Sequence, residues 1–234
     1  MRYTFVVTKS SGEELMGMAY TPVEDLTHGD SKALMEAYEL LREGRNPCLL
    51  AESPYPLVKS LLVAYLNSLS AHVYEPPSSA VGADVLDVME FNEQDTVAVV
   101  GYIGPVIKGL KGKVKEIVVL ERNPRRRGQA LPDVSAPRAL RRASKVIVTG
   151  ATLVNDTLDL ILEHSVDAEA VALVGATASI HPAPLFRRGV SVVAGFRVSP
   201  DRVEEVAKAL ALGGGTSEVY RHGYKYAVTH RSST

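Results

Sequence analysis

The first ninety residues combine short β-rich runs with longer segments of helical periodicity. Two β-rich runs flank the turn-forming sequence SSGE at residues 10–13, which predicts an antiparallel hairpin. Apolar residues then recur at helical spacing over residues 28–47 and 52–71, and residues 78–91 predict a third, shorter helix. Strands followed by helices are typical of a small α+β domain, which we place at residues 1–92.

From residue 93 onwards, short apolar runs alternate with segments that favour helices. The runs are TVAVVG, EIVVLE, SKVIVTG, AVALVG and VSVVAG. They are continuous rather than alternating, which indicates strands that are buried on both faces and run parallel. Residues 199–215 predict a final helix, and residues 218–230 predict a terminal hairpin through the sequence RHG. The predicted fold class is therefore α/β, with a doubly wound, mostly parallel sheet over residues 93–234.

Composition and charge narrow the range of partners. The 234 residues carry a formal net charge of −1, so no basic excess predicts nucleic-acid binding. No segment approaches the roughly 18 uninterrupted apolar residues of a membrane span. Cys48 is the single cysteine, which precludes an intrachain disulfide and fits a reducing compartment. We expect a cytoplasmic protein without nucleic-acid or membrane partners, most simply a homodimer, and a solvated loop at Arg125–Arg127.

Four of the five predicted parallel strands end in glycine, and the remaining one ends in a carboxylate. The glycines are Gly101, Gly150, Gly175 and Gly195, and the carboxylate is Glu121. In a doubly wound sheet, ligands bind outside the carboxyl ends of the strands. Glycine there lets the chain turn sharply and lets a ligand approach the backbone. One such glycine would mark only a tight turn, but four predict a crevice.

The turn after the first parallel strand matches part of a dinucleotide-binding fingerprint. Gly101, Tyr102 and Gly104 supply two of the three expected glycines, and Pro105 is suited to begin a helix whose first amides face an anion. Glu121 follows about 20 residues later, where an acid binds ribose in such proteins. A pair with the neighbouring arginine or a backbone amide would explain the same carboxylate equally simply.

Polar residues crowd the junction between the third parallel strand and the helix after it. They are Thr149, Thr152, Asn155, Asp156 and Thr157. Capping of the helix accounts for one of them. The others are typical of a site for a carboxylate, a phosphate or a metal-bound water, although elaborate capping would use the same residue types.

Small hydroxylated residues and a histidine follow the fourth parallel strand. Thr177 and Ser179 precede His181, which is the histidine best placed for acid–base chemistry or metal binding, although a lone loop histidine is often incidental. The sequence has no closely spaced zinc motif and no nucleophile elbow. Glu121, Asp156 and His181 are the candidate metal ligands, and they suit a hard cation or a metal already held by an organic ligand.

Motifs along nearly the whole chain resemble one known family. They are VAVVGYIGP, VLERNP, VTGATLVNDTLD, LVGATASIHPAPLF and AGF, preceded by GMAYTP and AYLNSLS in the N-terminal domain. In this order they resemble a domain of unknown function labelled "putative heavy-metal chelation domain". The resemblance implies an enolase N-terminal-like domain followed by a Rossmann-like domain. It also implies a role in metal handling or in cobalamin or tetrapyrrole metabolism.

The resemblance also points to individual residues. Matching motif positions are occupied by Gly101, Gly104, Glu121, Asn123, Thr149, Gly150, Asn155 and Thr157. Where the family usually has Gly-Pro-Ser, this chain has Gly175-Ala176-Thr177, which keeps a hydroxyl but loses the rigid proline.

These observations predict a small-molecule-binding protein, with or without enzymatic activity, whose anionic or metal-chelating ligand lies between the two domains. The expected ligand-binding residues are Gly101, Tyr102, Gly104, Pro105, Glu121, Asn123, Thr149, Gly150, Thr152, Asn155, Thr157, Gly175, Thr177 and Ser179. The expected cofactor is a divalent metal or a metal-chelating small molecule. Two alternatives stay open: an enzyme dependent on NAD or adenosylmethionine, and a non-catalytic metal sensor or delivery protein.

Overall fold

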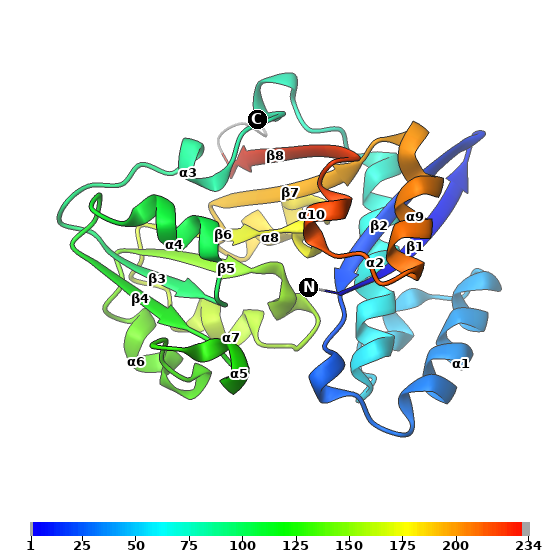
Figure 1. Cartoon of the computed structure of the whole chain (residues 1–234), viewed down its shortest axis with the longest axis horizontal. Helices are drawn as coiled ribbons and strands as arrows, with labels where there is room; N and C mark the ends of the chain where they lie inside the picture. The colour runs from blue at the N-terminus through cyan, green and yellow to red at the C-terminus, as the bar shows by residue number, and fades with distance from the viewer. Residues whose placement is uncertain (1, 231–234) are drawn as a thin grey trace.

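The computed structural model describes residues 2–230, which form a two-stranded sheet, a six-stranded sheet and the helices around them (Figure 1). The two-stranded sheet is the predicted hairpin, in which β1 (Tyr3–Ser10) pairs antiparallel with β2 (Glu13–Tyr20). Two helices follow, α1 (Asp30–Arg42) and α2 (Pro56–Val73), and α2 lies along the hairpin (Figure 1). We call these four elements and their connections the N-terminal unit.

The six-stranded sheet has the strand order β4-β3-β5-β6-β7-β8. The first five strands run parallel, and β8 is antiparallel to β7. The strands are β3 (Thr96–Val100), β4 (Glu116–Leu120), β5 (Lys145–Thr149), β6 (Ala170–Val174), β7 (Val192–Val198) and β8 (Gly223–Thr229). The mixed α/β fold with a mostly parallel sheet is therefore confirmed.

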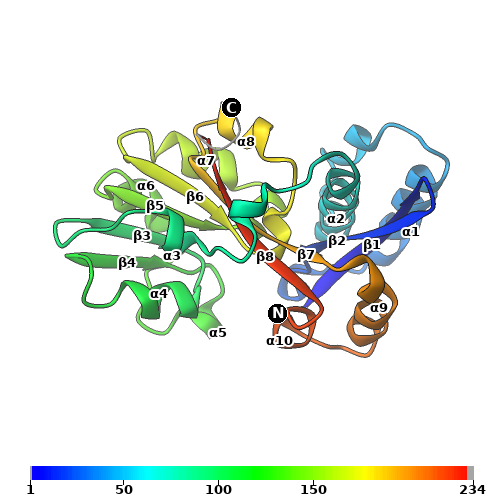
Figure 2. The ribbon, with the colours of Figure 1, turned by 90° about the horizontal axis from the view of Figure 1, so that it is seen from above.

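Helices cover both faces of the six-stranded sheet. The helices that follow the N-terminal unit are α3 (Val85–Val88), α4 (Gly104–Leu110), α5 (Pro124–Arg127), α6 (Ala136–Leu140), α7 (Leu158–Glu163), α8 (Pro182–Arg187), α9 (Val203–Ala211) and α10 (Thr216–Val219). In one core, α6, α7 and α8 pack on Val146 and Val148 of β5, and in the other, α3 and α4 pack on Ile147 of the same strand (Figure 2). Consecutive residues of β5 thus face opposite cores, which explains its continuous apolar sequence.

The strand order, which the sequence left open, places a topological switch point between β3 and β5. The chain crosses from β3 to β4 on one side, and then returns to β5 on the other side of β3. Ligands of doubly wound sheets bind in the crevice at such a switch point, outside the carboxyl ends of the strands. Gly101 and Thr149 lie at these two strand ends.

The C-terminal segment differs from the predicted terminal hairpin. Residues 216–219 form α10, and β8 pairs along its length with β7, which precedes α9 and α10 in the chain. Tyr226, Ala227 and Val228 of β8 are buried in this position, so pairing at the edge of the large sheet removes apolar surface that a separate hairpin would leave exposed.

The N-terminal unit and the six-stranded sheet are joined by shared packing. Met16 and Met18 of β2 pack in one cluster with Phe196 of β7 and with Val203 and Val206 of α9. The division at residue 92 and the enolase-like character of the N-terminal unit stay predictions. Within the described part of the chain, no helix combines the length and apolarity needed to cross a bilayer.

Candidate functional site

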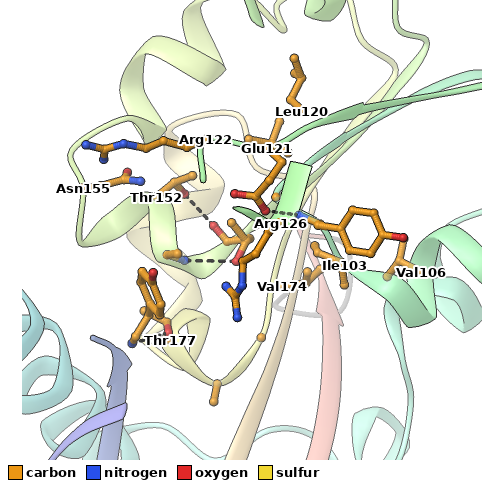
Figure 3. Close-up of a pocket in the computed structure, with 18 of the residues that line it drawn as sticks. Ile103, Val106, Leu120, Glu121, Arg122, Arg126, Thr152, Asn155, Val174 and Thr177 are labelled. Carbon is orange, nitrogen blue, oxygen red and sulfur yellow. Dashed lines mark hydrogen bonds between the residues drawn. The ribbon is translucent and has the colours of Figure 1, made fainter. Parts of the chain in front are cut away.

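A cleft of about 1380 Å³ lies at the carboxyl ends of the parallel strands, between the six-stranded sheet and the N-terminal unit (Figure 3). Twelve of the fourteen expected ligand-binding residues line it. They are Gly101, Tyr102, Gly104, Pro105, Glu121, Asn123, Thr149, Thr152, Asn155, Thr157, Gly175 and Thr177. The loops after β3, β4, β5 and β6 therefore converge as the glycine-ended strands predict, while the binding role of these residues stays a prediction.

The turn after β3 is shaped by Gly101. Its backbone has a φ of +91°, which L side chains rarely adopt, and a Cβ there would lie 2.7 Å from the Cγ2 atom of Thr149. The absence of a side chain at Gly101 thus lets the ends of β3 and β5 approach each other at the switch point. The Gly101 amide donates to the carbonyl of Leu120 (2.7 Å), so the turn is also tied to the end of β4.

Glu121 holds two of these loops together. One of its carboxylate oxygens accepts the backbone amide of Tyr102 (3.0 Å), and the other accepts the amide of Asn123 (2.8 Å). Asn123 in turn caps α5 by accepting the Arg125 amide (2.9 Å), and its own amide group donates to Glu24 (3.3 Å). The alternative explanation for Glu121, a bond to a backbone amide, therefore applies in this structure, and the carboxylate also faces the cleft (Figure 3).

Local hydrogen bonds account for part of the polar cluster after β5. The Thr149 hydroxyl accepts the Ala151 amide (3.4 Å), Thr152 donates to the Thr149 carbonyl (2.8 Å), and Thr157 donates to the Asn155 side-chain oxygen (2.6 Å). The backbone N–H of Asn155 donates to the Ala151 carbonyl (3.2 Å), but within residues 2–230 its side-chain amide nitrogen makes no hydrogen bond to protein. The cluster thus leaves the Asn155 amide available to a ligand.

Four of the candidate residues lie away from the cleft. Gly150 is buried against the Ala178 backbone, and Ser179 is buried in hydrogen bonds to Phe196 (2.8 and 3.0 Å). The carboxylate of Asp156 pairs with Lys59 of α2, and His181 caps α8 by accepting the Ala183 amide (3.2 Å). Gly150 and Ser179 thus shape the loop below the cleft, and Asp156 and His181 join or cap elements beside it.

The three candidate metal ligands are therefore not assembled into one site. Glu121 faces the cleft, whereas Asp156 and His181 do not line it. Among residues 2–230, no group of three or more His, Cys, Asp or Glu side chains is arranged to hold a metal ion. The side chains of the described residues thus do not fit a metal held by protein ligands alone.

The N-terminal unit contributes a wall of the cleft that sequence reasoning did not assign. Tyr3, Tyr20 and the short 3-10 turn η1 (Val23–Asp25) line it. The Tyr20 amide donates to the Thr177 hydroxyl (2.9 Å), and Asp25 pairs with Arg122 of the β4–α5 loop (3.4 Å). The run GMAYTP, which includes Tyr20, matches the family motif, and this match is the signal for the wall in the sequence.

Burial raises the pKa of four of the tyrosines that line the cleft. It raises the pKa of Tyr226 to about 12 and raises the pKa of Tyr3 and Tyr220 above the ordinary value of 10. Burial also raises the pKa of Tyr20, and its hydrogen bond to Glu24 raises it further. These phenols are neutral at pH 7, and the rings of Tyr3, Tyr20 and Tyr220 give the cleft apolar surface rather than general bases.

Glu24 keeps its charge despite its surroundings. Burial on its own would raise the pKa of Glu24, but hydrogen bonds from Tyr20, from a backbone amide and from Asn123 outweigh this effect. The positive charge of Arg126 lowers the pKa of Glu24 further. The mouth of the cleft therefore holds ionised groups of both signs.

The sequence of this chain matches a family model and a known protein over most of its length. A family model with the description "Putative heavy-metal chelation" matches residues 84–229. An uncharacterized protein of Methanocaldococcus jannaschii is 31% identical over 199 residues, which cover 84% of this chain and 75% of that protein.

Two solved structures of the same family, both of unknown function, share the fold. One, from Pyrococcus horikoshii, has a TM-score of 0.84 and 24% identity, and the match covers 98% of this chain and 89% of that chain. The other, from Desulfitobacterium hafniense, has a TM-score of 0.68 and 19% identity, with 95% and 89% covered. By its matched motifs, its curated relative and its fold, this chain belongs to the family described as "putative heavy-metal chelation".

Proposed function

We propose that this protein binds an anionic or metal-chelating organic molecule in the cleft between the N-terminal unit and the six-stranded sheet. The observation that carries this proposal is the convergence of four strand-end loops and the N-terminal unit around one cavity of about 1380 Å³. Pockets for drug-sized ligands usually measure about 300–1,000 Å³. The cleft therefore has room for a large organic molecule, with or without a bound metal ion.

The lining suits such a ligand in two respects. The turns at Gly101 and Gly175 expose backbone to the cleft, and the Asn155 amide is an available donor for an anionic group. Neutral tyrosines, among them Tyr3 and Tyr220, add ring surface for an apolar body. An anionic organic molecule would use both kinds of surface.

A metal ion fits this cleft better as cargo held by an organic ligand than as a resident cofactor. Glu121 already accepts two backbone amides, and Asp156 is paired with Lys59 outside the cleft. Soft heavy metals prefer thiolates, and Cys48 is exposed and does not line the cleft. We therefore propose that any chelated metal enters with its organic ligand.

A nucleotide cofactor is the second candidate function. Its support is the position of Glu121 in the cleft, at the end of β4 and bonded to the glycine turn after β3. In dinucleotide-binding folds an acid at this position binds ribose. Both oxygens of Glu121 accept amides here, however, so a ribose would have to share them.

The first experiment is a thermal-shift panel of NAD, NADP, adenosylmethionine, divalent metals, and corrinoid and tetrapyrrole precursors with and without metal. A ligand at 100 times its Kd stabilises the folded state by about 2.7 kcal/mol. For a chain of this size we expect a rise in Tm of about 5 to 11 °C. A shift with organic chelates or their metal complexes supports the proposal, whereas a shift with nucleotides alone favours the second candidate.

Two variants test whether the polar cluster after β5 binds the active compound. Thr149→Val and Asn155→Ala should each reduce the ligand-induced shift by at least half, because each removes a polar group that faces the cleft. Thr96→Val is the matched control. Thr96 is the first residue of β3 and lies at the end of the strand away from the cleft, so this variant should keep the full shift. A full shift in both cleft variants would remove the cluster from the site.

The assembly is tested separately. We propose a homodimer, and the sensor or delivery alternative predicts in addition that metal changes the assembly. Gel filtration with light scattering, with and without divalent metal, gives the mass in each condition. A metal-dependent change of mass would favour the sensor, and a constant mass would favour simple binding.

A further inference from the structure

The loop between β4 and α6 carries four arginines that differ in what they contact. The Arg127 guanidinium turns back and donates to the carbonyls of Glu121 (3.0 Å) and Arg122 (2.8 Å). Arg122, Arg125 and Arg126 instead line the cleft. Arg125 and Arg126 are exposed, as a solvated loop predicts, and they also line the cavity.

The backbone that carries these arginines is held in place. Asn123 caps α5 through the Arg125 amide (2.9 Å), and Arg127 fixes the preceding carbonyls. After α5, Leu131 donates to the Val119 carbonyl (2.8 Å) and accepts the Glu121 amide (2.9 Å). The side chains of Arg125 and Arg126 thus project from a fixed turn, which reduces the entropy lost when they bind a ligand.

Two of the arginines form no ion pair within the described part of the chain. Arg122 pairs with Asp25 (3.4 Å), and the cleft's Lys225 pairs with Asp84 (3.0 Å). Within residues 2–230, Arg125 and Arg126 form no ion pair, and neither guanidinium makes a hydrogen bond to protein. Figure 3 shows Arg126 extending into the cleft.

The described residues that line the cleft include six carboxylates and four cations, but none of these carboxylates forms an ion pair with Arg125 or Arg126. Glu121 is occupied by two backbone amides, and Glu24 accepts the Tyr20 hydroxyl and the Asn123 amide. Glu24 is close enough to Arg126 for that charge to lower its pKa, but it forms no ion pair with the guanidinium. Arg125 and Arg126 both line the cleft with unused guanidinium donors, so an oxyanion that both side chains reach would accept several charge-assisted hydrogen bonds.

We propose that Arg125 and Arg126 form an anion subsite that binds a doubly charged oxyanion group of the ligand, either a phosphate or a pair of carboxylates. This inference rests on the proposed function and narrows it, because the ligand must then carry at least two negative charges at one end. The subsite is separate from the Thr149–Thr157 cluster, which lies on the β5 loop. Arg127 positions the loop and does not touch the ligand.

The test measures binding of two small probes, pyrophosphate and citrate, by isothermal titration calorimetry. The variant is Arg125→Ala/Arg126→Ala. The control is Arg141→Ala/Arg142→Ala, which removes the same charge from exposed neighbouring positions at the end of α6, outside the cleft. We expect the cleft variant to weaken binding at least tenfold, the control to match the parent, and 0.5 M salt to weaken the parent as it screens the charges.

The two probes identify the chemical source of the charge. Tighter binding of pyrophosphate assigns the subsite to phosphate, and tighter binding of citrate assigns it to carboxylates. Absence of binding of both probes to the parent, or equal binding by parent and cleft variant, would overturn the subsite.

The active compound of the thermal-shift panel separates this inference from the proposed function. If Thr149→Val and Asn155→Ala lose the response to this compound while Arg125→Ala/Arg126→Ala keeps it, the function stands and the subsite fails. If the probes bind through the arginines but no organic compound stabilises the protein, the subsite stands and the proposed function fails.

Discussion

Replacing Gly17 by alanine is expected to lower the free energy of unfolding by about 3 kcal/mol or more, which is a large effect for the addition of one methyl group. Gly17 lies in β2 where α2 crosses the hairpin. A Cβ at this position would lie 2.1 Å from the Ala64 carbonyl oxygen and 2.2 Å from the Ser68 amide nitrogen. Both are backbone atoms, so a change of rotamer cannot relieve the clash.

Movement of α2 as a whole would also be costly. Ser68 donates to the Leu15 carbonyl (2.8 Å), and the Asn67 amide donates to the Met18 carbonyl (2.7 Å), on both sides of Gly17. The Asn67 amide also donates to the Thr177 carbonyl (3.1 Å) at the base of the cleft. Displacing α2 would therefore break buried hydrogen bonds and disturb the wall of the site.

Urea unfolding of parent and Gly17→Ala at pH 7 measures the change in the free energy of unfolding directly. A thermal scan should show a Tm lower by about 6 to 12 °C in the variant. Gly104→Ala is the control, because a Cβ at Gly104 meets nothing within 4 Å and its φ is not positive. We expect the control to change stability by less than about 0.5 kcal/mol. Equal stability of the two variants would show that the close approach at Gly17 is not limiting.

Local sequence patterns were sufficient to predict the cleft but not everything that surrounds it. Continuous Val, Ile and Ala runs can be buried on both faces only in a covered parallel sheet, and strand-end glycines mark the edge where loops meet a ligand. These signals are local. The strand order, the place of β8 and the wall formed by Tyr20 depend on contacts between segments distant in the sequence, and no local pattern encodes them.

Polar residues were the least predictable part of the site. Asp156, Ser179 and His181 have the chemistry of ligands, but each satisfies a group of the fold: a lysine of α2, the backbone of β7 and the first turn of α8. Capping and ligand binding use the same residue types, so composition cannot separate them. Arg125 and Arg126 show the reverse case, because a charged run that is typical of a solvated loop faces the cleft.

Replacing Asp95 by alanine is the second change for which we expect a large effect. It should lower the free energy of unfolding by about 3 to 5 kcal/mol. Asp95 is 3% exposed and lies just before β3, at the amino ends of the parallel strands and thus at the end of the sheet opposite the cleft. One carboxylate oxygen accepts the Ser144 hydroxyl (2.7 Å) and the Lys145 ammonium (3.0 Å), and the other accepts the Asn92 amide (2.8 Å). The variant would leave Lys145, which is also buried, with the exposed Glu169 as its remaining acidic partner.

The pH dependence of this loss has a definite sign. Burial on its own would raise the pKa of Asp95, but hydrogen bonds from Asn92, Ser144 and Lys145 outweigh it and lower the pKa below the ordinary value of 3.8. The stabilisation by Asp95 is therefore complete above its unfolded pKa, and it is lost as the pH falls through the lower, folded pKa. The difference in stability between parent and variant should be largest near pH 7 and should shrink in acid.

Urea unfolding of parent and Asp95→Ala at pH 7 and at pH 3 measures both effects. Glu169→Ala is the matched control, because it removes the exposed acid from the same lysine and should cost no more than about 1 kcal/mol. The double variant Asp95→Ala/Lys145→Met should recover part of the loss, since it leaves no unpaired charge in the interior. If Asp95→Ala and Glu169→Ala cost the same, then burial does not set the strength of this ion pair. If the loss in Asp95→Ala is instead independent of pH, it reflects the missing volume of the side chain rather than its charge.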